Sequence, residues 1–327
     1  MRKYKVPTGD ICIIDGEKGR PLEFLSIGDY GKEKNMKADF LGLSDEINGV
    51  PHGDILPLKE KWVVTISSQY GCSMNCSFCD VPKVGAGINA TYTDMLNQVH
   101  HAIALHPEVK RTNRLNLHYA RMGEPTWNRD VILSAYTIAD ILKPKGWGFH
   151  PVVSTMMPKN NKDLQSYISN WLDLKDELNG EAGLQLSINT TSDEVRTETM
   201  PNAMSIRDIS DMMYDILAFR EVPKGRKITL NFALTEAPID AKLLGMLFSK
   251  RHFICKITPM HNTDACIKNG LLTDDGYDSF YPYKEVEKAL KDEGFDVIVF
   301  IPSHEEDNSK ITCGNVILAT EKENQNG

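Results

Sequence analysis

The sequence has no run of about 18 or more apolar residues, so no segment is long enough to form a transmembrane helix. Its first residues, MRKYKVPTGDICIIDG, are partly basic but lack the apolar stretch of a secretory signal. Internal repeats and low-complexity tracts are also lacking. These absences predict a cytoplasmic globular protein that needs no membrane partner.

An excess of positive charge is lacking as well. The 327 residues include 37 Lys and Arg against 45 Asp and Glu, which gives a formal net charge of −8. A protein that binds nucleic acid mainly through its overall field is expected to be basic, so that class is disfavoured. The charge balance does not exclude a local basic groove, although residues 1–60 contain no basic arm.

The seven cysteines do not read as a disulfide framework, because no secretory signal accompanies them. Three of them form a C-x₃-C-x₂-C run, Cys72, Cys76 and Cys79, directly after an apolar segment. Iron–sulfur clusters are held by cysteine thiolates at such local spacings. Three ligands on a four-iron cluster would leave one iron open, as a catalytic cluster requires.

Two other interpretations of the three thiols are weaker. Structural zinc takes four ligands and commonly two cysteine pairs, and no second pair occurs here. A fourth zinc ligand could still come from one of three histidines, namely His100, His101 or His118. Disulfide formation is the other interpretation, but three crowded cysteines are poorly suited to pairing.

Strands and helices alternate from residue 61 onward. The expected strands are Trp62–Ser67, Arg114–Tyr119, Phe149–Ser154, Gly183–Ile188, Lys227–Leu234 and His252–Ile257. Each is followed by a segment of helical periodicity, and one of these helices is expected to begin after Ser205 as its N-cap. Six such units predict an α/β fold with a parallel sheet, a partial (β/α)6 barrel rather than a closed eight-stranded one.

Four regions follow from this pattern. Residues 1–60 are expected to be a β-rich extension containing a hairpin of Asp10–Ile14 and Leu22–Ile27. Residues 61–260 form the barrel core. Residues 261–320 form a C-terminal strand–loop cap that carries Cys313, with strands at Asp296–Ile301 and Asn315–Leu318. Residues 321–327 are expected to be a disordered tail.

Short polar residues occupy the ends of successive predicted strands. In parallel barrels the reactive face lies where strands end and the following loops begin. Besides the cysteine run, those positions hold Gly123, Glu124, Ser154, Ser187 and Asn189. Each alone is more often a turn or a helix cap, but their recurrence after a cluster motif predicts a binding site for a small polar ligand.

Several of these segments resemble the RlmN/Cfr group of radical S-adenosylmethionine (SAM) methyltransferases. The resemblance covers about Trp62 to Leu318. It is carried by Ser67–Cys72 with the cysteine triad, Arg121–Asn128, Ser187–Asn189, Glu194–Pro201 and Thr312–Asn315. That group installs methyl groups on adenine ring carbons of ribosomal RNA, and in some members also of transfer RNA.

The resemblance implies a role for each matching residue. Cys72, Cys76 and Cys79 would ligate a 4Fe-4S cluster whose open iron chelates SAM. Gly123 and Glu124 would contact the methionine amino end of SAM. Ser154, Ser187 and Asn189 would contact its ribose or carboxylate, Asn189 standing where the family often has His.

Cys313 matches the cysteine that first accepts a methyl group from SAM and then presents it to a radical made from a second SAM. The resemblance also implies an electron donor such as flavodoxin or ferredoxin, and an RNA or nucleotide-like substrate. The alternative for Cys313 is a structural thiol.

Two features depart from the family pattern. Thr65 stands where the family has a second catalytic cysteine, and a hydroxyl cannot form the disulfide that releases product. Cys12, Cys255 and Cys266 remain as other thiols. The family's N-terminal RNA-binding domain also has no counterpart in residues 1–60. The alternatives are therefore an enzyme that only abstracts hydrogen from a small molecule, and a non-catalytic iron–sulfur redox protein.

Overall fold

The computed structural model describes residues 1–29, 46–47, 50–51, 55–222, 224–273, 276–277, 281–313 and 315–320. Its main sheet has ten strands in the order β1-β2-β3-β6-β7-β8-β9-β10-β11-β12. The parallel part comprises β6 (Trp62–Ile66), β7 (Leu115–Tyr119), β8 (Phe149–Thr155), β9 (Gly183–Ser187), β10 (Ile228–Leu234), β11 (Phe253–Pro259) and β12 (Val297–Val299). Neighbours in the sheet are neighbours in the chain, and the sheet does not close, so the predicted partial (β/α)6 barrel is confirmed.

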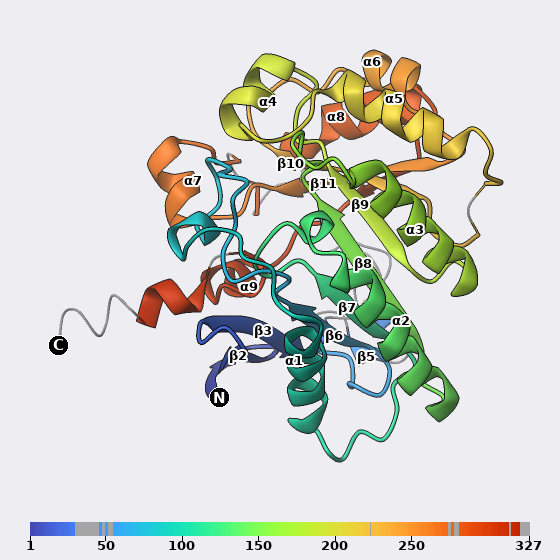
Figure 1. Ribbon diagram of the computed structural model, residues 1–327. Coiled ribbons are helices and arrows are strands. Elements are labelled where there is room, and N and C mark those ends of the chain that lie inside the picture. Colours follow the sequence, from blue (N-terminus) through green and yellow to red (C-terminus); the bar gives the residue numbers. More distant parts are fainter. Residues whose placement is uncertain are drawn as a thin grey trace.

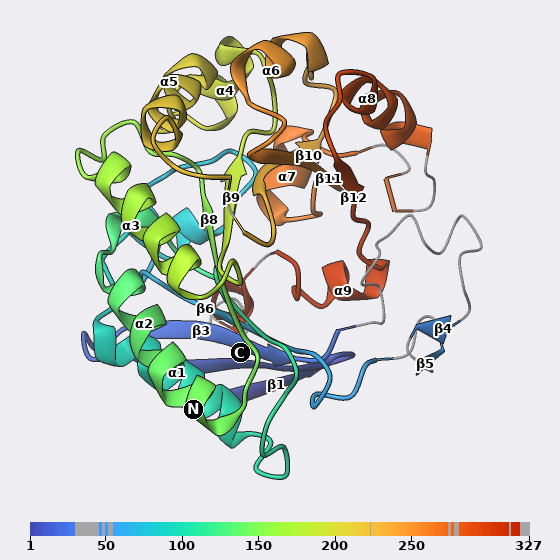
Figure 2. The same ribbon diagram turned by 90° about the vertical axis from the view of Figure 1, so that its right-hand side faces the viewer.

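Helices cover the outer face of this curved sheet (Figure 2). They are α1 (Tyr92–Ala104), α2 (Asp130–Leu142), α3 (Leu164–Glu177), α5 (Ile206–Leu217), α6 (Ala241–Leu247) and α8 (Tyr281–Asp292). Local sequence fixes their starts. Thr91 and Asp94 form a capping box at α1, and Ser205 caps α5 as predicted.

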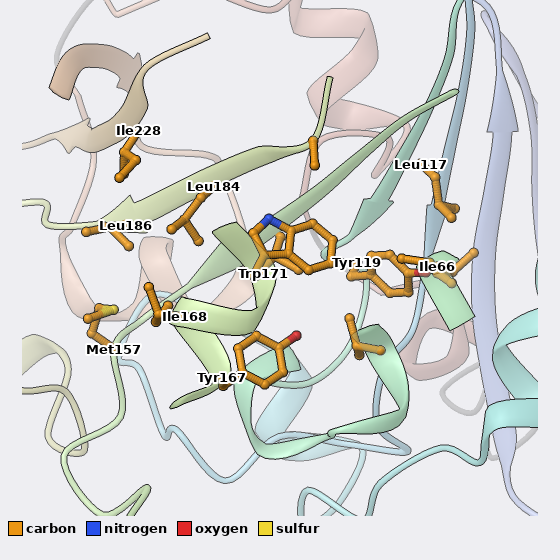
Figure 3. Packing of buried hydrophobic residues seen from close by; sticks show 14 of the residues in the cluster. Ile66, Leu117, Tyr119, Met157, Tyr167, Ile168, Trp171, Leu184, Leu186 and Ile228 are labelled. Carbon is orange, nitrogen blue, oxygen red and sulfur yellow. The ribbon is translucent and has the colours of Figure 1, made fainter. Parts of the chain in front are cut away.

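Alternation along the parallel strands separates an apolar outer face from a polar inner one. Outward residues such as Leu117, Tyr119 and Leu186 are fully buried against the helices, where Trp171 of α3 packs edge-on against Tyr119 (Figure 3). Inward positions of β9 hold Gln185 and Ser187, which are only half-buried. Barrels with packed interiors fill such positions with branched apolar side chains, so this interior is built to hold something else.

The N-terminal segment extends the same sheet. Strands β1 (Arg2–Val6), β2 (Gly9–Asp15) and β3 (Pro21–Ile27) are antiparallel, and β3 pairs with β6 (Figure 1). The predicted hairpin is therefore present as β2 and β3, whereas β1 was not predicted. A separate pair of short strands, β4 (Glu46–Ile47) and β5 (Val50–Pro51), also lies in this region. The division into domains stays a prediction.

One predicted strand is wrong. Residues 316–320 are helical, where a strand over Asn315–Leu318 was expected. The Asn315 side chain accepts a hydrogen bond from the amide of Leu318, which is an N-cap interaction that outweighs the β propensity of Val316 and Ile317. The predicted disordered tail at 321–327 lies outside the described residues.

Three short helices were not predicted. They are α4 (Asp193–Thr199), α7 (Asp264–Asn269) and α9 (His304–Asn308). All three lie in loops that follow strands, and each is too short to show a helical period in the sequence.

Candidate active site

The three cysteines of the motif lie together in the loop after β6. Cys72 and Cys76 are buried and Cys79 is half-buried. Burial raises the pKa of Cys72 to about 12 and that of Cys79 to about 11, and the thiols also repel one another's negative charge. Burial raises the pKa of Cys76 as well, with added repulsion from Cys79 and Cys72. Three adjacent thiols thus share a site in which burial outweighs the nearby positive charges of Arg196 and Lys83.

This donor set fits a polynuclear iron cluster. In the described part of the chain, no three His, Cys, Asp or Glu side chains converge as ligands of a single metal ion. A 4Fe-4S cluster places each thiolate on a different iron, so its ligands stand further apart than those of one ion. The loop is also closely packed, because a Cβ at Gly71 would lie 2.1 Å from the Gly85 carbonyl oxygen.

Segments far away in the sequence hold the cysteine loop in place. The Asn202 amide donates to the carbonyl of Ser73 at 2.9 Å, and the Asn269 amide donates to that of Ser77 at 2.6 Å. Thr263, the N-cap of α7, donates to the carbonyl of Phe78 at 2.7 Å. In return, Asp80 accepts from the first two amides of α7. The α4–α5 connection and α7 therefore clamp the loop from two sides.

Gly123 and Glu124 lie beneath the loop rather than in an open cavity. Gly123 has a φ of +99°, and a Cβ there would lie 2.5 Å from the Cβ of Gln69, so only glycine fits. The buried Glu124 carboxylate accepts from Thr126 and from the Met156 amide at 2.8 Å. Burial raises the pKa of this carboxyl, and these donors oppose the rise. Its oxygens already hold the end of β8.

Two neighbouring cavities that share lining residues open at the barrel. We call the one at the carboxyl ends of β9, β10 and β11 the upper cavity; it has a volume of about 490 Å³ and includes Glu198 and Glu236 in its walls. The barrel cavity, of about 320 Å³, lies among the inward side chains of β7 to β11. Both are lined by Phe78, Asn189, Ala233 and Met260.

The barrel cavity brings together four of the predicted site residues, and they are Ser154, Ser187, Asn189 and Cys313. Asn189 has a φ of +61°, a conformation that Asn tolerates, and its side chain accepts from the Ala233 amide at 3.1 Å. Thr65 lies on β6 in register with His118, and it lines neither cavity as described.

The segment that carries Cys313 is anchored by a buried carboxylate. Asp307 accepts from Thr312 at 2.6 Å, from His261 at 3.0 Å and from the Asn262 amide at 2.8 Å. Burial alone would raise the pKa of Asp307, but these hydrogen bonds hold it well below the usual value. Because His261 and Asn262 follow β11, this network joins the Cys313 segment to the barrel.

Cys313 lies close enough to the cysteine loop for charges to interact. Its side chain is exposed into the cavity, and the surrounding protein raises its pKa to about 12, first by desolvation and then through Cys79 and Asp307. Among the other thiols, Cys266 also interacts with both Cys79 and Cys313 and contacts the Phe78 carbonyl at 3.5 Å. Cys12 and Cys255 are fully buried in strands elsewhere in the sheet.

Arg196 is a site residue that the sequence analysis did not single out. It lies on α4, almost fully buried, and donates to the carbonyls of Ile188 at 2.6 Å and Met156 at 3.3 Å. Burial lowers its pKa to about 10, while the negative charge of Asp193 and then of Cys76 opposes that shift. A buried cation beside the cysteine loop joins the ends of β8 and β9. The only signal was its place within the segment Glu194–Pro201.

A second missed residue is Glu23 of β3, which is fully buried. One oxygen pairs with Arg121, whose Nε lies at 2.6 Å. The other accepts from the amides of Val316 at 2.9 Å and Ile317 at 3.1 Å. Glu23 therefore caps the helical residues that follow Cys313 and ties them to the loop that carries Gly123. A lone Glu in the apolar run Pro21–Ile27 was its only signal.

The fold is similar to that of a radical SAM methyltransferase of known structure. The structure matches the crystal structure of a radical SAM methyltransferase from Sphaerobacter thermophilus with a TM-score of 0.62 and 18% sequence identity, over 94% of this chain and 78% of that one. At that identity the match establishes the fold. No family model matches the sequence.

The sequence is similar to RNA methyltransferases of the RlmN type. It is 30% identical over 189 residues to a probable dual-specificity RNA methyltransferase RlmN of Bacteroides fragilis, covering 57% of this chain and 49% of that one. It is 27% identical over 239 residues to the dual-specificity RNA methyltransferase RlmN of Geotalea uraniireducens, covering 70% and 62%. The ribosomal RNA large subunit methyltransferase N of Nitrosopumilus maritimus is 28% identical over 183 residues, covering 54% and 47%.

These relatives confirm the resemblance found in the sequence, and the radical SAM methyltransferases that it resembles use a 4Fe-4S cluster and SAM. The chain spans about half the length of the first of these relatives. Its described helices include none that is long and apolar enough to cross a membrane.

Proposed function

We propose that this chain is a radical SAM methyltransferase that acts on an sp² carbon of a nucleobase through methylated Cys313. The observation that carries the proposal is the position of Cys313, which lines the barrel cavity and interacts electrostatically with Cys79. A thiol that receives a methyl group near SAM and then offers it to a substrate must face both. The cluster, when bound, supplies the electron that cleaves SAM.

The chain's own residues have the following roles in this proposal. Cys72, Cys76 and Cys79 hold the cluster. Since the Glu124 carboxylate is engaged with Thr126 and Met156 and the Glu124 amide donates to Gln69, the backbone carbonyls of Gly123 and Glu124 are the acceptors left to meet the SAM ammonium. The remaining proposed SAM contacts are Ser154, Ser187 and Asn189.

The proposed substrate class draws on the names of the relatives. RNA is in the names of those relatives, so RNA is one proposed source of the base, and a smaller nucleotide-like molecule is the other. A flavodoxin or ferredoxin is the proposed electron donor. Cys266 is the thiol best placed to resolve the Cys313 adduct in the absence of a cysteine at Thr65, because it interacts with Cys313 and lies on α7.

The test is incubation of the anaerobically prepared, reduced protein with methyl-labelled SAM, followed by peptide mass spectrometry. We expect 5′-deoxyadenosine and a labelled methyl group on Cys313. Cys313→Ala should lose the label, and Cys266→Ser should retain it, as should the control Cys12→Ser. An unlabelled Cys313 with full activity in Cys313→Ala would instead favour an enzyme that only abstracts hydrogen.

A further inference from the structure

The barrel cavity contains cationic side chains without acidic partners. Arg226 and Lys256 line it beside a neutral His118, whose pKa burial lowers to about 3, and its described lining includes no Asp or Glu. The Lys256 ammonium forms no ion pair with a described residue and lies 5.2 Å from the centre of the Phe300 ring. Desolvation, followed by the charge of Arg226, lowers its pKa to about 8. A partly buried cation of this kind calls for an anion that the protein itself does not supply.

Lys256 belongs to a row of polar groups on three neighbouring strands. In the register of the sheet, Asn231 of β10 lies beside Ser187 of β9 on one side and Lys256 of β11 on the other. All three line the barrel cavity. Asn231 is only 9% exposed, and its side-chain oxygen has no hydrogen-bond partner among the described groups. Buried polar atoms are nearly always paired, so this oxygen marks a place for a ligand group.

The two ends of the barrel cavity carry different chemical groups. Arg226 precedes β10 and so lies toward the amino ends of the strands, whereas Cys313 follows β12 and lies with the loops at the other end. A ligand that spans the cavity would put its charged group near Arg226 and Lys256 and its reacting group near Cys313. The volume of about 320 Å³ is that of a site for a small molecule.

We propose that the barrel cavity binds a small substrate that carries a phosphate or carboxylate group, paired by Lys256 and Arg226, and a hydroxyl or amino group that donates to the side-chain oxygen of Asn231. This names the substrate class of the proposed function, on which the reaction part of the inference rests; binding itself does not depend on SAM cleavage. The substrate is then a single small molecule enclosed by the strands, and not a base presented by an RNA strand.

Calorimetric titration of the reconstituted full chain tests this proposal. The probes are inorganic phosphate, acetate and a short single-stranded RNA, and the variants are Lys256→Met with the control Lys242→Met. Lys242 lies exposed on α6. We expect saturable binding of phosphate or acetate, weakened at least about tenfold by Lys256→Met and unchanged by Lys242→Met. Whichever anion binds more tightly identifies the group.

The opposite results would overturn the proposal. These are no saturable binding of either anion, equal effects of the two Lys variants, or tight RNA binding that Lys256→Met leaves intact. If Lys256→Met failed to fold, Arg226→Gln would take its place, since Arg226 is exposed at the start of β10. Anion binding by a protein that does not cleave SAM would refute the proposed function and leave this inference standing.

Discussion

The upper cavity and the barrel cavity adjoin but differ in charge and in construction. The upper one has Glu198 and Glu236 in its described walls and no Lys or Arg, while the barrel cavity has Arg226 and Lys256 and no acid. A cationic ligand group suits the first, and an anionic group suits the second. One fold thus offers neighbouring places to two ligands of opposite charge.

The strand part and the loop part of the site are also assembled differently. The barrel cavity follows from strand register, because inward positions of adjacent strands meet without any further contact. The cysteine loop and the Cys313 segment depend on hydrogen bonds between distant residues, such as Asn269 to Ser77 across 192 positions. A change in a loop contact should therefore affect the part of the barrel cavity lined by Thr312 and Cys313 and spare the part formed by the strand residues.

Cys76→Ala is expected to have the largest effect, because it should abolish the chemistry of the cysteine loop and leave anion binding in the barrel cavity unchanged. Without its third thiolate the site should hold no stable cluster, so iron content and 5′-deoxyadenosine formation should both be lost. Cys12→Ala, in a buried strand position of the N-terminal hairpin, is the control and should keep its iron. Binding of phosphate or acetate in the barrel cavity should survive in both variants. Activity retained in Cys76→Ala would rule out the cluster assignment.

Glu23→Ala is expected to have the next largest effect. It leaves Arg121 buried without its partner and frees two amides of the helical residues after Cys313, so we expect a loss of about 3–5 kcal/mol of unfolding free energy. Urea denaturation measures it.

Arg129→Ala is the matched control for the Glu23 variant, because its pair with Asp163 is 73% and 55% exposed. It should cost at most about 1 kcal/mol. In the folded fraction of Glu23→Ala, methylation of Cys313 should fall while anion binding in the barrel cavity persists. Equal stability losses in the two variants would contradict this account of Glu23.

Lys256→Met should stabilise the protein, in contrast to Glu23→Ala. The pKa of Lys256 lies at about 8 in the folded protein against an ordinary 10.5, so the unfolded chain binds the extra proton between these values and wild-type stability rises with pH there. Without added anion at pH 7, the variant should be more stable by at most about 3 kcal/mol. This gain should shrink between pH 8 and 10.5.

Thermal unfolding across that pH range is the measurement for Lys256. Lys242→Met should shift stability by no more than about 0.5 kcal/mol at any pH, because its side chain is exposed. Destabilisation by Lys256→Met would mean that Lys256 already has a partner that satisfies its charge.

The sequence alone was sufficient to predict those parts of the structure that depend on periodic patterns and on local interactions. Strands β6 to β11 and the helices between them follow from apolar alternation and from caps such as Ser205. It was insufficient where a residue acts through distant partners. Glu23 meets Arg121 across 98 positions and Val316 across 293, and nothing near Glu23 in the chain signals either contact.

The same limit applies within the site. The cysteine motif is a local pattern, so it could be found by inspection. The grouping of Ser187, Asn231 and Lys256 depends on the pairing of three strands, and only Ser187 was selected from the sequence. Arg196 escaped notice because its partners are backbone carbonyls, which carry no side-chain signature.

The bond from Glu23 to the amide of Val316 also sets an order of events during synthesis. At about 5–20 residues per second, a ribosome takes about 15–60 s to add the 293 residues between them. Throughout that interval the hairpin carboxylate lacks these amides, and the Cys313 thiol has not yet been made. The barrel strands can pair as they emerge, whereas the segment that carries Cys313 can be fixed only after the residues that meet Glu23 have been made.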